Sequence, residues 1–218
     1  MKAWVLIVLS FAGADSFAAE LLAQRHDNHL GARIEDITFP DSFRGDLTSG
    51  LTNRLMIRLT VHQGTQELHS RSVEIAIRYD LWDEQFTMTT QLEGNDLEIS
   101  VYRDVQQVIQ RLQTIQLPTL FSTKSVPANA ELIMQAVVLL NPIDRERMDA
   151  IKEWVAKNSR RSSLDPAAAM GVGDISMSNA IFNRIFEQYA SGSDVASAWH
   201  EKLTSAPFRV DTLPHESR

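Results

Sequence analysis

The sequence predicts an α+β protein: an antiparallel, β-sandwich-like domain with a crossing helix and a C-terminal helical appendage. Two runs in which polar and apolar residues alternate, 54–62 and 72–79, predict a half-buried hairpin near the centre of the chain. Stripes of apolar residues with helical spacing follow, one over 103–116 and others near the C-terminus. The alternation therefore indicates a central sheet, and the stripes indicate helices that cross and follow it.

The composition is that of a folded protein and argues against several classes. Of the 218 residues, 44% are apolar and 22% are charged, unlike a disordered or collagen-like chain. The formal net charge of −7 argues against a nucleic-acid partner bound through a basic face. Because the chain has no cysteine, it cannot use disulfides, thiolate-bound metals, a cysteine nucleophile or a lipid-modified cysteine.

The N-terminus has the three parts of a secretory signal. Lys2 is followed by an apolar run over 3–12 and by small residues over 13–19. The apolar run is shorter than the ~20 residues of a membrane-spanning helix, so we expect a cleaved signal peptide over 1–18 rather than an anchor. A cut after Ala14 is the alternative. The mature chain is then expected in the periplasm or outside the cell, with no later segment apolar enough to span a membrane.

The predicted β-rich domain covers 19–158. A polar lead-in, a first strand and a short helix precede the hairpin, and they are expected at 20–30, 32–39 and 41–51. Two further alternating runs extend the hairpin to a four-stranded meander, and they are expected at 85–92 and 97–102. The helix over 103–116 is expected to end at Leu117-Pro118, because the residue before a proline disfavours the helical conformation.

The second half of the chain mixes a buried strand with helices. Residues 131–140 are apolar on both faces, which is typical of a strand covered on both sides. Asn141-Pro142 is expected to open a further helix with Asn141 as its N-cap. A linker and a C-terminal helical segment are expected at 159–175 and 176–218, with two amphipathic helices in the latter at 179–190 and 195–203.

In its layout the chain resembles an uncharacterised family of exported bacterial proteins, known only as a domain of unknown function. The resemblance covers Ile34 to Pro142 and lies in the order of a hairpin ending at Tyr79, a helix ending at Leu117-Pro118 and a last strand ending at Asn141-Pro142. It implies a β-sandwich and no known catalytic residues, and the chain from Ser159 onward departs from it.

Motifs of catalysis are missing from the sequence. It contains no Gly-x-Ser-x-Gly, no Ser-x-x-Lys and no phosphate-binding glycine loop, and His200-Glu201 is followed by Thr204 where a zinc protease requires a second histidine. His26 and His29 have a metal-like spacing, but they lie in the expected lead-in. His62 and His69 flank the hairpin turn, where the alternation places them on opposite faces of the sheet unless a bulge intervenes.

Two acidic turns follow the hairpin, one with Asp80, Asp83 and Glu84 and one with Glu93 and Asp96. Carboxylates on adjacent loops can bind calcium, but successive turns of a meander lie at opposite ends of the sheet. Solvated turns are therefore expected.

Trp82, in the first of these turns, either packs on the end of the domain or projects as an anchor for a partner, and packing is the favoured alternative.

The C-terminal stripe is the strongest indication of a partner. Its residues are Ile181, Phe182, Ile185, Phe186 and Tyr189. Such a helix either docks into another protein or folds back over the apolar strand 131–140, and the second alternative is favoured.

We therefore expect a non-enzymatic envelope protein that acts as an interaction or scaffolding module. It would bind an envelope protein partner through its C-terminal helices and require no metal or cofactor. The alternatives are a small-ligand or lipid-binding module and, third, a hydrolase.

Overall fold

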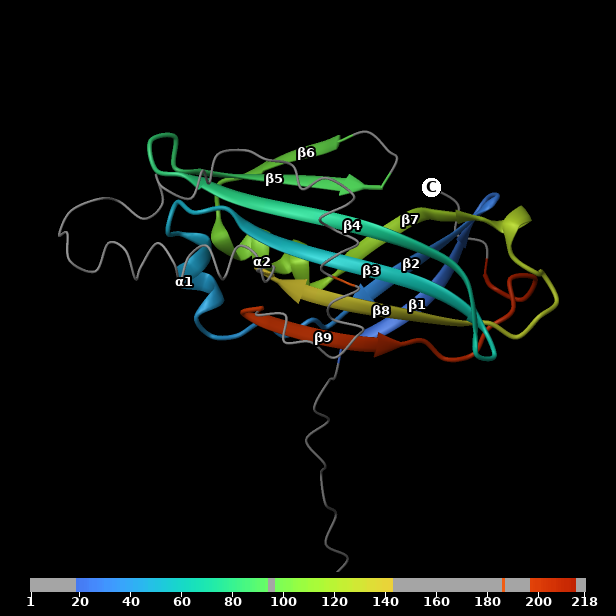
Figure 1. The fold of residues 1–218 in the computed structure, drawn as a ribbon. Helices are drawn as coiled ribbons and strands as arrows, with labels where there is room; N and C mark the ends of the chain where they lie inside the picture. Colours follow the sequence, from blue (N-terminus) through green and yellow to red (C-terminus); the bar gives the residue numbers. More distant parts are fainter. Residues whose placement is uncertain (1–18, 94–96, 143–185, 187–196, 215–218) are drawn as a thin grey trace, which may run out of the picture.

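The computed structural model describes residues 19–93, 97–142, 186 and 197–214. The strands are β1 (Glu20–His26), β2 (His29–Glu35), β3 (Asn53–Gln63), β4 (Gln66–Asp80), β5 (Gln85–Leu92), β6 (Leu97–Tyr102), β7 (Ile115–Ser122), β8 (Ile133–Leu140) and β9 (Trp199–Thr204). Two α-helices, α1 (Phe43–Leu47) and α2 (Val105–Gln113), and a short 3-10 helix, η1 (Thr123–Ser125), complete the described elements. The strands form two antiparallel sheets, β1-β2-β7 and β6-β5-β4-β3-β8-β9 (Figure 1).

The β3-β4 hairpin lies at the centre of the six-stranded sheet, as the alternation predicts. β3 pairs with β4 on one side and with β8 on the other. The predicted inward residues of β3, among them Leu55, Ile57 and Leu59, are fully buried. β5 and β6 continue the hairpin into the expected four-stranded meander. The period-two pattern therefore predicted the order of these strands and the inward face of β3.

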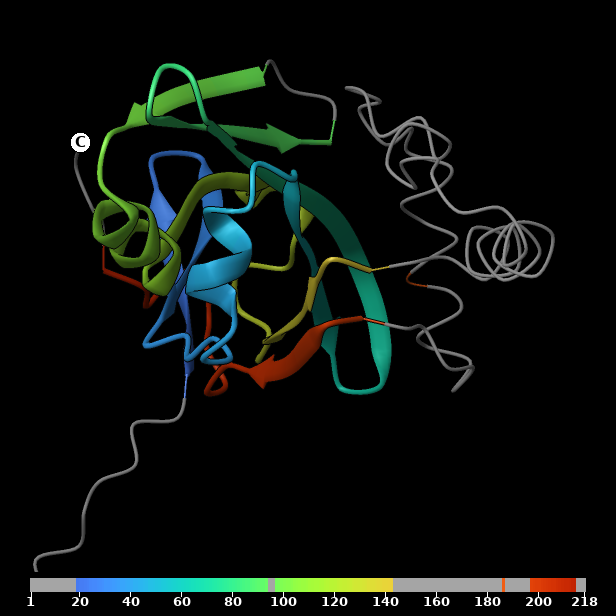
Figure 2. The ribbon, with the colours of Figure 1, turned by 90° about the vertical axis from the view of Figure 1, so that its left-hand side faces the viewer.

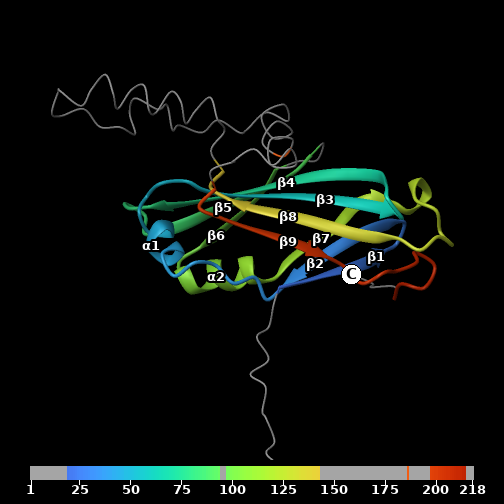
Figure 3. The ribbon, with the colours of Figure 1, turned by 60° about the horizontal axis from the view of Figure 1, so that its bottom comes forward.

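One apolar core fills the space between the sheets. It includes side chains from both sheets and from α1 and α2, with Leu30, Ile57, Val108 and Val138 fully buried. The helices and the three-stranded sheet lie on the same side of the six-stranded sheet (Figure 2). α1 and α2 cover one end of this side, and β1, β2 and β7 cover the other end (Figure 3). The short helix is confirmed for Phe43 and Leu47, but it begins after Ser42 rather than Asp41.

The expected lead-in over 20–30 is wrong. Glu20–His26 forms β1 and pairs antiparallel with β2, from Glu20 opposite Glu35 to His26 opposite His29. The segment is mostly polar because one face of β1 is only partly covered, whereas Leu21 lies in the core. Few large apolar residues therefore suffice to hold this strand.

The chain after α2 also differs from the expectation. α2 ends at Gln113, and the residues expected to end the helix, Leu117-Pro118, lie inside β7. Pro118 is tolerated because β7 pairs with β2 alone among the described strands, and its pairing shifts between Leu30 and Ala32. Gly31 lies at this shift, where a Cβ atom would come within 2.7 Å of the Leu117 carbonyl oxygen. A glycine is therefore required where β7 crosses β2 at its irregular point.

The expectation of a last helix over 195–203 is wrong for the residues in this range that the structure describes. Trp199–Thr204 forms β9, which pairs antiparallel with β8 so that Leu140 lies opposite Trp199. Apolar residues four apart fit one face of a helix, but four is also a multiple of the two-residue repeat of a strand. The signal peptide, the linker and the helix expected after Pro142 lie outside the described residues.

Asn141 ends β8 with a set of specific contacts. Its φ of 47° lies in the left-handed region, which asparagine tolerates better than most residues. Its side-chain oxygen accepts a hydrogen bond from the Arg54 backbone N–H at 2.7 Å, and its amide nitrogen donates to the Asn53 side-chain oxygen at 2.9 Å. These two hydrogen bonds of Asn141 therefore join the end of β8 to the beginning of β3.

Candidate interaction surface

Exposed large apolar side chains gather in two places on the described part of the chain. The first, which we name the tip, consists of Leu51, Leu81 and Trp82. The second, which we name the β6 row, consists of Leu97, Ile99 and Val101 on the edge strand of the six-stranded sheet. Both belong to the β4-β5-β6 region or to the loop that leads into β3. They are the strongest candidates for an interaction surface, because solvent-exposed apolar side chains that lie together often mark binding sites.

The tip is built on the turn between β4 and β5. The Asp80 carboxylate accepts hydrogen bonds from the backbone N–H groups of Trp82, at 2.8 Å, and Asp83, at 3.1 Å. These bonds hold the pKa of Asp80 below its ordinary value of 3.8, because they favour the ionised carboxylate. Glu84 has a φ of 49° and closes the turn. The turn that carries Trp82 thus has a defined conformation rather than a random one.

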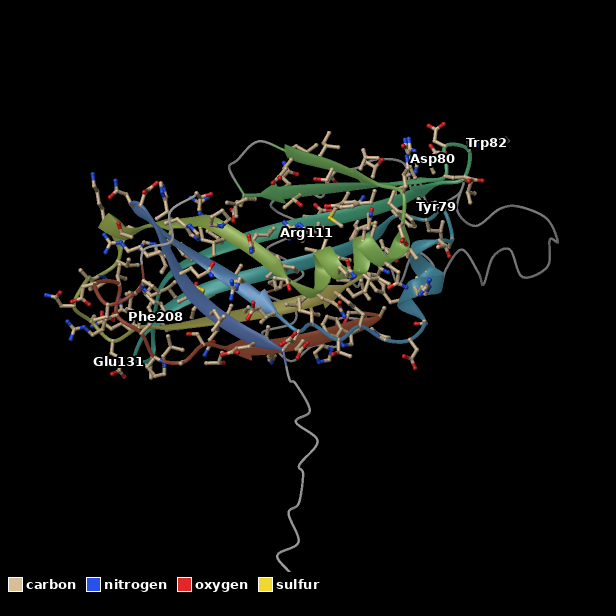
Figure 4. The ribbon with its side chains drawn as sticks, turned by 180° about the vertical axis from the view of Figure 1, so that it is seen from behind. Tyr79, Asp80, Trp82, Arg111, Glu131 and Phe208 are labelled. Atoms are coloured by element: carbon tan, nitrogen blue, oxygen red, sulfur yellow. The ribbon has the colours of Figure 1, made fainter. Side chains whose placement is uncertain are left out.

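Trp82 projects from this turn instead of packing on the domain. It is 95% exposed, so the favoured expectation of packing is wrong. The rings of Tyr79 and Phe86, one on each strand, lie 4.6 Å apart and fill the end of the core in its place. Strand pairing continues as far as Asp80 opposite Gln85, which carries the turn beyond the covered region. Figure 4 shows Trp82 at the opposite end of the molecule from Glu131 and Phe208.

Two leucines extend the apolar surface of the tip. Leu81 is 63% exposed and Leu51 is 56% exposed. The loop that carries Leu51 lies against the turn, because a Cβ atom on Gly50 would lie 3.2 Å from the Leu81 Cδ1 atom. Acidic side chains accompany them: Asp80, Asp83 and Glu84 all belong to the turn region. The tip is therefore a small apolar surface on a turn that carries three acidic side chains, with Arg78 close enough to Asp80 to lower its pKa.

The β6 row arises from an alternation that is inverted with respect to the core. β6 pairs with β5 so that Ser100 lies opposite the buried Met88, and Ile99 lies opposite Thr89. Glu98 and Ser100 therefore face the inner side of the sheet, whereas the apolar residues of β6 face the outer side. The alternation in the sequence predicts a strand here, and the pairing with β5 shows that its apolar residues lie on the outer face.

The histidines do not form a site with the acidic residues. No group of three or more His, Asp or Glu side chains that could hold a metal ion occurs within the described ranges. His62 and His69 lie on opposite faces, as predicted, although the pairing does shift between Val61 and His62. The His62 Nε2 atom lies 2.9 Å from the Thr60 hydroxyl, and the His69 Nε2 atom lies 2.7 Å from the Ser125 carbonyl oxygen.

The two acidic turns lie at opposite ends of β5, as the meander predicts. The turn at Asp80 and the turn at Glu93 therefore do not share a ligand set, and Asp96 lies outside the described residues.

Of the C-terminal stripe, the structure describes Phe186 alone. It is helical and 3% exposed. Ile181, Phe182, Ile185 and Tyr189 lie outside the described residues. On the outer face of the six-stranded sheet, Met56 and Leu139 lie opposite each other and are also fully buried, although neither belongs to the core between the sheets. Docking into another protein and folding back over strand 131–140 therefore both stay predictions for the stripe.

These features define a mostly antiparallel β protein with two sheets and few helices in its described part. None of the described helices is long and apolar enough to cross a membrane. No family model, curated protein or solved structure matches the chain.

Proposed function

We propose that the protein is an exported, non-enzymatic interaction module of the cell envelope, and that it binds a partner protein through the tip. The sandwich-like pair of sheets serves as a rigid support for the turn between β4 and β5. The observation that carries this proposal is the 95% exposure of Trp82 on a turn held by the Asp80 carboxylate. Export is inferred from the signal-like N-terminus, over 1–18.

A tryptophan on an ordered turn is well suited to be an anchor. Tryptophan is enriched among the residues that dominate binding free energy, since it buries about 150–250 Å² and has few rotatable bonds. At about 25 cal/mol per Å², its burial supplies about 4–6 kcal/mol before the costs of association. Because Asp80 already orders the backbone at Trp82, less conformational entropy is lost on binding. Leu51 and Leu81 extend the area that a partner would cover.

The charges around the tip indicate the chemistry of the partner. Asp80, Asp83 and Glu84 belong to the same turn region as Leu81 and Trp82, and they outnumber Arg78, whose charge acts on Asp80. The whole chain has a formal net charge of −7. An apolar pocket rimmed by Lys or Arg complements this surface and would be approached faster at low ionic strength. A surface of anionic lipids, in contrast, would repel it. We therefore propose a protein partner with a basic rim. Partner binding through the C-terminal helices stays a prediction.

The test compares Trp82→Ala with Glu131→Ala, a matched control on an exposed residue at the opposite end of the molecule. Each full-length variant is crosslinked in its own cell envelope, and the crosslinked proteins are identified and then purified for binding measurements. We expect the partner to be recovered with the wild type and with Glu131→Ala, and its Kd to rise at least about 30-fold for Trp82→Ala. The affinity should also fall as ionic strength rises.

Two results would contradict the proposal. Equal partner affinity for Trp82→Ala and wild type would show that the tip is not the binding surface. Binding to vesicles of anionic lipid that depends on Trp82, without a protein partner, would show that the tip is a membrane anchor instead.

A further inference from the structure

The β6 row has no role in the proposed function, and its geometry is unusual for an edge strand. Its three side chains are 51% (Leu97), 61% (Ile99) and 55% (Val101) exposed on the outer face of the sheet. Beside them on β5 lie the uncharged residues Thr87, Thr89 and Gln91. An edge strand that packs only on its own core would carry its apolar residues on the inner face. β6 therefore presents its apolar side chains away from the core that it belongs to.

The backbone of the same three residues faces the open edge of the sheet. The Glu93 N–H donates to the Ser72 carbonyl oxygen at 3.0 Å, which makes these opposed residues a hydrogen-bonded pair between β5 and β4. Because such pairs alternate along antiparallel strands, the even-numbered residues of β5 direct their backbone groups toward β6. These bond to their even-numbered partners on β6, such as Ser100 opposite Met88. The N–H and C=O groups of Leu97, Ile99 and Val101 consequently point away from β5.

Within the residues that the structure describes, the edge lacks most of the usual protections against pairing. Lysine, proline and bulges commonly block an exposed edge strand. β6 has no lysine or proline, and its pairing with β5 is regular. Its single charged residue, Glu98, faces the inner side of the sheet and is the one such protection that β6 carries. Among the described strands β5 is its only neighbour. The edge is thus able to accept another strand.

We propose that this strand is β6 of a second copy of the chain, paired antiparallel about a two-fold axis through Ile99. In this register Ile99 lies opposite its own copy, Leu97 lies opposite Val101, and Glu98 lies opposite Ser100. Each apolar side chain then meets an apolar side chain, and the outward backbone groups of all three residues of the row are paired. The two six-stranded sheets become one continuous sheet.

The sequence of β6 selects this axis over its neighbours. An axis through Glu98 would place two carboxylates opposite each other, which is unfavourable. An axis through Ser100 would place Leu97 opposite Arg103. Only the axis through Ile99 places every residue of the β6 row opposite another residue of the row and keeps the charged side chains apart. Because β6 is thus complementary to itself, a second copy of the chain is a better partner than a strand of another protein.

The absence of cysteine from the chain allows a direct test of the axis. Residues opposite each other in a hydrogen-bonded antiparallel pair have Cα atoms about 5.5 Å apart, which is within the range that a disulfide spans. We expect Ile99→Cys to form a covalent dimer on mild oxidation. Thr89→Cys, on the same face but one strand further from the axis, should remain monomeric in denaturing gels. A stronger crosslink of Leu97→Cys with itself than of Ile99→Cys would refute the register.

Sedimentation equilibrium of the full-length chain provides the second measurement. The wild type is expected to dimerise, and Ile99→Lys should weaken the dimer at least about a hundredfold, because both copies of the side chain are lost from the axis. Since Ile99 is exposed, far-ultraviolet circular dichroism should show an unchanged fold. A monomeric wild type at every concentration would overturn the proposal. Trp82→Ala should leave the dimer intact, so the self-association and the partner-binding proposals can fail separately.

Discussion

The crossing of β2 and β7 at Gly31 allows a sharp test of how the three-stranded sheet is held. In Gly31→Ala, the new methyl group would lie 2.7 Å from the Leu117 carbonyl oxygen, 2.8 Å from the Pro118 carbonyl oxygen and 2.9 Å from the Pro118 Cα atom. All three are backbone atoms, so no side-chain rotation can relieve the contact. Overpacking typically costs about 1–3 kcal/mol, and this rigid case should cost about 3 kcal/mol. For a chain of this size that lowers Tm by about 6–12 °C.

Urea denaturation followed by circular dichroism measures this change. Gly45→Ala is the matched control, since a Cβ atom there meets nothing within 4 Å and lies in α1. Alanine is the better helix former, so this control should stabilise the protein by about 0.5–1 kcal/mol. We therefore expect the two alanine substitutions to change the free energy of unfolding in opposite directions. A Gly31→Ala protein as stable as the wild type would refute the close approach of β7 to β2.

Two further predictions concern side-chain hydrogen bonds. Asn141→Ala removes the acceptor of the Arg54 N–H and the donor to Asn53, and it should lower the free energy of unfolding by about 1–3 kcal/mol in urea; wild-type stability would contradict this. Since the folded-state pKa of Asp80 is lowered, its stabilisation of the turn is present above the ordinary value of 3.8 and is lost as pH falls through the lowered pKa. An NMR titration of the Asp80 carboxyl carbon should show this low pKa, and a midpoint at or above 3.8 would contradict it.

The central sheet was predictable from sequence because its strands alternate strictly. Leu55, Ile57 and Leu59 recur every second residue, and this pattern identifies a strand with one apolar face, which in β3 is the buried one. The other strands lack so clear a signal. β1 is largely polar, β7 contains Pro118, and Trp199 and Leu203 in β9 have a spacing that also fits a helix. In these cases tertiary pairing decides the structure, and a local pattern does not report it.

The two candidate surfaces also differ in how far the sequence predicts them. Trp82 was identified as a candidate anchor from its place in a turn, but its exposure depends on how far β4 and β5 remain paired and on the Tyr79–Phe86 contact that fills the end of the core. The β6 row was missed because alternation does not say which face of a strand is buried. That face is determined by the partner strand, through the pairing of Ser100 with Met88.

β9 also determines when the fold can be completed. In the described part of the chain it is the last strand, and it covers the edge of β8, whose residues Val138 and Leu140 are buried. β8 ends at Leu140 and β9 begins only at Trp199, so until β9 has paired the described sheet ends in an apolar strand with unpaired backbone groups. Such an edge readily pairs with other chains. We therefore expect the edge of β8 to be prone to pairing with other chains for as long as β9 has not joined the sheet.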